Sequence, residues 1–186
     1  VVIQDLDTSG RDLQLSVITA KSDFSFAGGN WAGSTFTATT YVPVMPVTDV
    51  DFLIAQGGSG DNYFDFSASD VDVYLNGAGG DDILLAGSGN DILTGGIGID
   101  QLTGGGGSDE VIETHAADFR LSTNKLRIGT DGEDTLTTIE SVYLRAQLLE
   151  TDLDGKKLDA SGADNYHITL IGTELNDEIF ASAHGD

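Results

Sequence analysis

Four aspartates recur every nine residues in the middle of the chain: Asp82, Asp91, Asp100 and Asp109. Each is the sixth residue of a nine-residue unit, and the units of residues 77–112 read GAGGDDILL, AGSGNDILT, GGIGIDQLT and GGGGSDEVI. The units contain neither Cys nor His, so carboxylate oxygens and turn carbonyls are their candidate ligands. Such oxygens favour a hard cation over Zn²⁺ or copper. The spacing therefore predicts a series of similar cation sites.

The predicted cations must come from outside the chain. Lys and Arg are absent from residues 22–119, whereas Asp and Glu occur there 15 times. Two carboxylates about 4.8 Å apart, the distance between neighbouring strands, repel each other by roughly 3.5 kcal/mol at an effective dielectric constant of about 20. Mg²⁺ is disfavoured because it requires strict octahedral geometry and holds its waters tightly. Several Ca²⁺ ions are therefore the expected cofactor.

The other positions of the unit predict how the chain folds around the aspartates. Glycine or alanine dominates positions one, two and four, where a tight turn with positive φ is easiest. Position eight carries a branched apolar side chain in every unit: Leu84, Leu93, Leu102 and Val111. Three strand residues bury little surface alone, so the units are expected to stack, two to a coil. This stacking places Asp82 over Asp100 and Asp91 over Asp109, on opposite edges of a flattened coil.

The units resemble the nonapeptide of the repeats-in-toxin (RTX) family, G-G-x-G-x-D-x-U-x. The resemblance implies an all-β fold, a right-handed parallel β-roll or β-helix solenoid with Ca²⁺ between the turns of neighbouring coils. It also implies the four aspartates as ligands, with carbonyl oxygens from turn glycines: Gly77, Gly79, Gly80, Gly87, Gly89, Gly96, Gly98, Gly105 and Gly107. A flexible acidic linker is the plainer interpretation, but a linker gains nothing from an apolar residue at every ninth position.

Both ends of the array allow two interpretations. Asp118 lies one period beyond Asp109 in a segment without glycine, and either closes the last site above Asp100 or is an ordinary surface residue. Upstream, residues 57–64 read GGSGDNYF and resemble a unit with Asn62 at position six. They precede the first unit by 20 residues instead of 18, so an unrelated glycine turn explains them equally well.

A longer repeat encloses the short one. Residues 64–91 align with residues 158–186, and residues 52–56 with residues 143–147. The first alignment pairs Gly77 with Gly172, Asp82 with Asp177 and Asp91 with Asp186. We therefore expect Asp177 and Asp186 to be metal ligands at the start of a second roll. The chain is interpreted as an excerpt of a long repetitive protein.

Composition divides the chain into four parts. Residues 1–56 have few glycines and alternating apolar residues, which predict antiparallel or edge strands with a turn at residues 28–30. Residues 57–118 are the predicted roll, residues 119–171 a β-rich connecting segment, and residues 172–186 the start of the second roll.

Two segments keep open alternatives. Residues 138–150 are compatible with a short helix or a strand, and the resemblance favours the strand. Trp31, Phe36 and Tyr41 form either an exposed binding patch or, more commonly for such aromatic residues, a small core or a cap on the roll.

Charge and composition exclude several functions. The chain has 31 acidic and 8 basic residues and a net charge of −23, which excludes a nucleic-acid-binding protein and disfavours anionic membrane surfaces. No apolar run is long enough to span a membrane. His115, His167 and His184 are scattered and no nucleophile has a base beside it, so no enzymatic activity is expected.

The resemblance to RTX proteins implies an extracellular bacterial protein, secreted or attached to the cell surface, that leaves the cell by type I secretion and folds on binding Ca²⁺. The long repeat favours a structural module of an adhesin, a surface layer or a matrix fibre, with further copies of itself as possible partners. The alternative is an accessory module of a secreted enzyme or toxin. No motif indicates a glycan or a cell-surface ligand.

Overall fold

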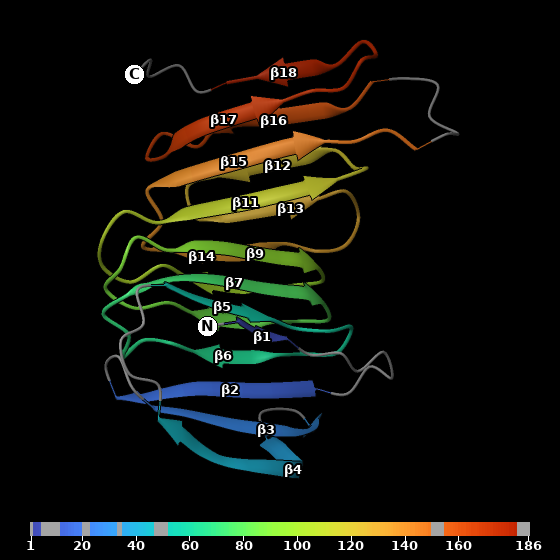
Figure 1. Ribbon diagram of the computed structural model, residues 1–186. Coiled ribbons are helices and arrows are strands. Elements are labelled where there is room, and N and C mark those ends of the chain that lie inside the picture. The colour runs from blue at the N-terminus through green and yellow to red at the C-terminus, as the bar shows by residue number, and fades with distance from the viewer. Residues whose placement is uncertain are drawn as a thin grey trace.

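The computed structural model describes residues 52–149 and 155–181, and in addition the backbone of strands at residues 2–4, 12–19, 23–32 and 35–46. Every regular element in these ranges is a β-strand, so the predicted all-β class is confirmed. The strands form two sheets in which most neighbours are parallel (Figure 1). No helix of the described ranges is long and apolar enough to cross a membrane.

The first sheet has seven strands, and all of its neighbouring strands are parallel. Its order is β1 (Val2–Gln4), β5 (Phe52–Gln56), β7 (Asp72–Gly79), β9 (Ile92–Ile97), β11 (Glu110–His115), β15 (Ser141–Ala146) and β17 (His167–Ile171).

The second sheet has eleven strands and two antiparallel regions. Its order is β18 (Glu178–Phe180), β16 (Lys157–Gly162), β12 (Phe119–Ser122), β13 (Lys125–Ile128), β14 (Asp134–Thr137), β10 (Gln101–Thr103), β8 (Ile83–Leu85), β6 (Tyr63–Asp65), β2 (Asp12–Thr19), β3 (Asp23–Ala32) and β4 (Thr35–Pro46). The neighbours β2, β3 and β4 are antiparallel, and so are β12, β13 and β14. The other pairs are parallel.

Between residues 72 and 115 the chain alternates regularly between the two sheets. Strands β7, β9 and β11 belong to the first sheet, whereas β8 and β10 belong to the second. Leu75 therefore pairs with Leu93 in one sheet, and Leu84 pairs with Leu102 in the other. Each pair is two units apart, as the nine-residue period predicts. Two units bring the chain back to the same sheet.

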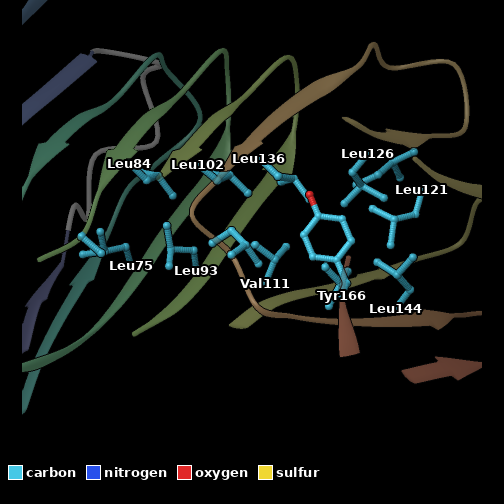
Figure 2. Packing of buried hydrophobic residues seen from close by; sticks show 14 of the residues in the cluster. Leu75, Leu84, Leu93, Leu102, Val111, Leu121, Leu126, Leu136, Leu144 and Tyr166 are labelled. Carbon is cyan, nitrogen blue, oxygen red and sulfur yellow. The ribbon is translucent and has the colours of Figure 1, made fainter. Parts of the chain in front are cut away.

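Position eight of the units supplies the core between the sheets. Its four side chains are fully buried: Leu84, Leu93, Leu102 and Val111. Figure 2 shows Leu84, Leu102 and Leu136 in one row, opposite a second row that contains Leu75, Leu93 and Val111. Full burial of one such side chain stabilises the fold by about 1.5–3 kcal/mol. The apolar column is thus a continuous part of the core between the sheets.

Replacement of Leu102 by Ala is expected to lower the free energy of unfolding by about 2–5 kcal/mol, because the rigid backbone on both sides leaves a cavity. Urea unfolding in saturating Ca²⁺ measures this loss. The matched control is Ile97→Ala, because Ile97 is 58% exposed. The control should change stability by no more than about 0.5 kcal/mol. Equal losses in the two variants would contradict the assignment of Leu102 to the core.

Of the N-terminal segment, β1 and β5 belong to the first sheet, and β2, β3 and β4 extend the second sheet. Strands β2, β3 and β4 lie at its end as antiparallel neighbours, as predicted (Figure 1). The turn predicted at residues 28–30 is wrong, because β3 runs through them. The register shifts between Gly28 and Gly29, which is a common use of glycine inside a strand. The side chains of Trp31, Phe36 and Tyr41 lie outside the described residues.

The structure distinguishes between the alternatives for residues 138–150 and for residues 57–64. Residues 141–146 form strand β15, so the strand interpretation of this segment is confirmed and the helix is wrong. Residues 57–64 are in register with the first unit, because Tyr63 pairs with Ile83 and Phe64 with Leu84. The two additional residues lie between β6 and β7, in a segment where the Ser69 N–H donates to the Phe66 carbonyl at 2.7 Å.

The longer repeat is visible in the strand order. The corresponding strands β5 and β15, and likewise β7 and β17, lie in the first sheet. Strands β6 and β16, and likewise β8 and β18, lie in the second sheet. Each segment of the later copy therefore occupies the same sheet as its counterpart, in agreement with the alignment.

Candidate metal centre

The turns between the strands stack their position-six side chains into two columns. The first column consists of Asn62, Asp82, Asp100 and Asp134. Its members are linked by hydrogen bonds from backbone to side chain: Asn62 N–H donates to Asp82 Oδ1 at 2.7 Å, Asp82 N–H to Asp100 Oδ1 at 2.8 Å, and Asp100 N–H to Asp134 Oδ1 at 2.9 Å. Each carboxylate thus satisfies one donor of the preceding turn.

The second column lies on the other edge and consists of Asp91, Asp109 and Glu140. Val73 N–H donates to Asp91 Oδ1 at 2.8 Å, and Asp91 N–H donates to Asp109 Oδ1 at 2.9 Å. Asp109 N–H donates to Glu140 Oε2 at 2.8 Å. Asp91 therefore stacks with Asp109, and Asp82 with Asp100, as the two-unit period predicts.

The second oxygen of three carboxylates has no hydrogen-bond partner. Asp82, Asp100 and Asp109 are at most 1% exposed, and their Oδ2 atoms are buried without a donor. Asp91 differs, because its Oδ2 accepts the N–H of Gly87 at 3.2 Å. A buried charged oxygen without a partner is strongly unfavourable unless a proton or a cation is beside it. The four repeated aspartates are thus not equivalent.

Position-one glycines form the cradle that these oxygens face. A Cβ on Gly77 would overlap Asp82 Oδ2 and would lie 2.8 Å from the carbonyl oxygen of Gly95 in the next coil. A Cβ on Gly104 would overlap both Asp109 Oδ2 and the carbonyl oxygen of Thr138. A carboxylate oxygen and a carbonyl oxygen therefore converge on one small space at each glycine. Two acceptors without a donor between them fit a cation with oxygen ligands, such as Ca²⁺.

The carbonyls of several predicted glycines point from one coil towards a glycine of the next coil. A Cβ on Gly98, Gly105 or Gly107 would overlap the carbonyl oxygen of Gly80, Gly87 or Gly89, respectively, in the preceding coil. Glycine is required at these positions because each carbonyl points at the next turn. The Gly77 carbonyl accepts a hydrogen bond from Asn62 Nδ2 at 3.3 Å. Gly79 and Gly96 lie in the paired ends of β7 and β9.

Burial is the main cause of the raised pKa values of the aspartates in the columns. It raises the pKa of Asp82 to about 9 and that of Asp100 to about 7, from an ordinary value of 3.8. The same cause raises the pKa of Asp134 to about 7 and that of Asp91 to about 6. Neighbouring carboxylates add to these shifts. The ionised columns therefore require compensation by positive charge.

Ala78 occupies a turn position that suits glycine. It lies at position two with φ of 79°, whereas the equivalent Gly96 has φ of 103°. Ala78→Gly is expected to raise the free energy of unfolding in Ca²⁺ by about 1 kcal/mol, because a side chain in this region costs about 1–3 kcal/mol and glycine also loses more backbone entropy. Thermal unfolding measures the gain. The control Ala68→Gly, at an exposed residue with ordinary φ, should instead lose stability.

The ends of the columns differ from the sequence-based expectations. Asp118 does not lie above Asp100. It is exposed, and its Oδ1 accepts the Lys157 N–H at 2.9 Å. Of its two interpretations, the surface residue agrees with the structure. The place above Asp100 belongs to Asp134, because strand β14 follows β10 in the second sheet.

The Asp177 carboxylate is satisfied by protein donors. Its Oδ1 accepts the Lys156 N–H at 2.7 Å, and its Oδ2 accepts the Thr173 N–H at 2.5 Å. Its unit begins at Gly172, where a Cβ would overlap Asp177 Oδ2. Asp186 lies outside the described residues.

Sequence reasoning missed Asp134 and Glu140. Residues 129–137 read GTDGEDTLT and match the nonapeptide at positions one, four, six and eight, so the pattern alone could have revealed Asp134. The unit was hidden by its distance of 34 residues from Asp100. The β12–β13 hairpin accounts for the extra length. Glu140 carries no such signal, because its place depends on the turn after β14.

A hydrogen bond between Glu113 and the partly buried His115 lies beside the first column. Glu113 is 0% exposed, and its Oε1 accepts the Gly95 N–H at 2.6 Å while its Oε2 lies 2.8 Å from His115 Nε2. The hydrogen bond to Glu113 raises the pKa of His115. This shift favours the protonated imidazolium of His115, which lies close enough to Asp100 and Asp134 to lower their pKa values.

No group of three or more His, Asp or Glu side chains converges on one point among the described residues. A cation in either column would instead bind carboxylate oxygens together with backbone carbonyls. No family model, curated protein or solved structure matches the chain.

Proposed function

We propose that this chain is a calcium-binding structural module of an extracellular bacterial protein, of the adhesin, surface-layer or matrix-fibre type. Its two sheets would be the walls of a right-handed parallel β-roll. The regular pairing of β7 with β9 and of β8 with β10 supports this architecture. A right-handed path is the usual one for connections between parallel strands. The resemblance of the units to RTX repeats supports the same architecture.

The observation that carries the proposal is the set of three buried, unpartnered carboxylate oxygens on Asp82, Asp100 and Asp109. Each faces a glycine with no Cβ to fill the space, and carbonyl oxygens of the next coil converge on two of these spaces. The chain has a net charge of −23, and the segment that contains these oxygens has no Lys or Arg residue. A hard cation from solution satisfies the charge and the ligand chemistry together.

The proposed role of Ca²⁺ is to drive folding. Asp82 would hold one ion with the carbonyl of Gly95, Asp109 would hold a second with the carbonyl of Thr138, and Asp100 would hold a third beside Gly95. When bound, the ion supplies the positive charge that neutralises the buried carboxylates. Without it, the columns repel, and strands β6 to β11, which are three to eight residues long, bury too little surface to offset the chain entropy. Extracellular Ca²⁺ modules bind at about 10⁻⁴–10⁻³ M, which suits folding after export.

A structural role is favoured over a catalytic one. The aspartates are at most 1% exposed and their oxygens face the backbone, whereas metal-assisted hydrolysis needs an open coordination position. Between the structural module and an accessory module of a secreted enzyme or toxin, the repeated strand order of the longer unit supports the former. Negative-stain images of the intact protein distinguish them, since filaments or a lattice are expected only of the former.

Calcium binding to wild-type protein and to Asp82→Asn tests the proposal. We expect several bound Ca²⁺ per chain in equilibrium dialysis, and a loss of at least one ion in Asp82→Asn. Asp81→Asn is the matched control, because Asp81 is exposed and its Oδ1 accepts the Ile99 N–H, which an amide oxygen also accepts. The control should retain all of its ions. Wild-type protein that binds none at millimolar Ca²⁺ would refute the proposal.

A further inference from the structure

Among the residues that the structure describes, the first column ends in an amide instead of a carboxylate. Asn62 holds position six of the turn formed by residues 57–62, and its backbone N–H donates to Asp82 Oδ1 as Asp82 N–H donates to Asp100. The side chain is 1% exposed, and its Oδ1 has no hydrogen-bond partner among the described residues. Asn62 is thus the structural counterpart of the aspartates, without their charge.

Three oxygens surround the amide nitrogen of Asn62. Its Nδ2 donates to the Gly60 carbonyl at 2.5 Å, to Asp82 Oδ1 at 3.1 Å and to the Gly77 carbonyl at 3.3 Å. All three neighbours are acceptors, so the nitrogen and not the oxygen of the amide must face them. Turn carbonyls and carboxylates are also the oxygen ligands that Ca²⁺ binds in proteins.

The space beside Gly77, one coil later, corresponds to the space beside Gly57. It is also bordered by a turn carbonyl and a position-six side chain, but it contains no hydrogen-bond donor. A Cβ on Gly57 would overlap the Gly77 carbonyl oxygen and lie 2.6 Å from Asn62 Nδ2. A Cβ on Gly77 would lie 2.8 Å from the Gly95 carbonyl oxygen and overlap Asp82 Oδ2, which has no partner. The amide nitrogen therefore stands where the next coil presents an unsatisfied oxygen.

We propose that the Asn62 amide takes the place of a cation and closes the first column to Ca²⁺ at the end beside β6. This inference rests on the proposed function. The NH₂ group supplies partial positive charge to the oxygens that would otherwise need an ion, so the turn of residues 57–62 stacks on the next turn without metal. Asn62 then limits the number of Ca²⁺ ions that the first column binds.

The Asn62→Asp variant tests this limit. The variant places a fourth oxygen among three others, which is unfavourable without a cation. With Ca²⁺ bound, these oxygens would be four of the about six to eight ligands that the ion takes. In equilibrium dialysis at millimolar Ca²⁺ we expect one more bound ion per chain than in wild-type protein. In low Ca²⁺ the variant should unfold at a lower temperature than wild type.

Asn90→Asp is the matched control, with the same chemical change on an exposed turn residue. Asn90 Oδ1 accepts the Ser108 N–H at 3.0 Å, and an aspartate retains that hydrogen bond. We expect the control to bind as many ions as the wild type. An unchanged ion count in folded Asn62→Asp, or the same gain in the control, would overturn the proposal.

A measurement on wild-type protein covers the case in which Asn62→Asp does not fold. With Ca²⁺ bound, the side-chain NH₂ resonances of Asn62 should exchange slowly with solvent, because the nitrogen stays enclosed. An ion at this place would bind the amide oxygen instead and release the NH₂ group, so rapid exchange would overturn the proposal. Absence of any Ca²⁺ binding by wild type would refute the proposed function itself, which separates the two failures.

Discussion

Removal of Ca²⁺ at neutral pH is expected to abolish the β-sheet circular dichroism of the protein, and re-addition should restore it. The cause is the burial of Asp82, Asp100 and Asp109, whose Oδ2 atoms have no protein donor. Two such carboxylates at the strand spacing repel by roughly 3.5 kcal/mol when both are ionised. Otherwise the folded state has to take up protons at pH 7, because burial raises the pKa of Asp82 to about 9, and this uptake also costs stability. A small domain is stable by only about 5–15 kcal/mol. Loss of several ions therefore removes most of the stability.

A triple variant with Asn at Asp82, Asp100 and Asp109 separates charge repulsion from nonspecific effects of the chelator. Its neutral amides imitate the arrangement at Asn62, where an NH₂ group donates to turn carbonyls. We expect the circular dichroism of this variant to be insensitive to Ca²⁺. Wild-type protein that remains fully folded in excess chelator would contradict calcium-coupled folding.

Acidification is expected to replace part of the effect of Ca²⁺. In metal-free buffer the β-sheet signal at pH 5.5 should exceed that at pH 8. Burial raises the pKa of Asp100 and Asp134 to about 7 and that of Asp82 to about 9, against 3.8 in the unfolded chain. The folded state therefore binds more protons in this window, so its stability falls as the pH rises from about 4 towards 9. This direction is opposite to ordinary acid denaturation.

The neighbours of the column act in the same direction. The pKa of His115 is raised by its hydrogen bond to Glu113, so its contribution to stability is present at low pH and is lost as the pH rises through the folded value. Asp100→Asn should reduce the difference between pH 5.5 and pH 8. Glu133→Gln, at an exposed residue, should leave it unchanged. A metal-free protein that is more folded at pH 8 would contradict this account.

Much of the central fold could be predicted because the units are local and regular. Small residues at positions one, two and four permit turns, and an apolar residue at position eight marks one inward side chain. Two units of nine return the chain to the same sheet, which predicts that Asp82 stacks with Asp100. These inferences depend on neighbouring residues and a period, and both are properties of the sequence.

The ends of the columns could not be predicted in this way, because they depend on insertions. The β12–β13 hairpin moves the partner of Asp100 from Asp118 to Asp134. Two additional residues between β6 and β7 leave Asn62 in register, although the spacing suggested otherwise. An insertion shifts the numbering without disturbing the pairing of strands, so a fixed period loses the register that the sheet retains.

The sequence alone determined the all-β class, the two-unit period and the residues that face the cores and the turns. The tertiary structure decided which carboxylate oxygens lack a partner. Asp91 follows the same pattern as Asp109, yet only Asp91 Oδ2 accepts a backbone N–H, from Gly87. Gly87 belongs to the same unit as Asp91, whereas the equivalent N–H of Gly105 donates to Thr138 Oγ1 of the stacked turn at 2.7 Å. The difference therefore depends on the turn stacked against each unit. Satisfaction of a buried oxygen is a property of its surroundings in space, which a repeating sequence does not specify.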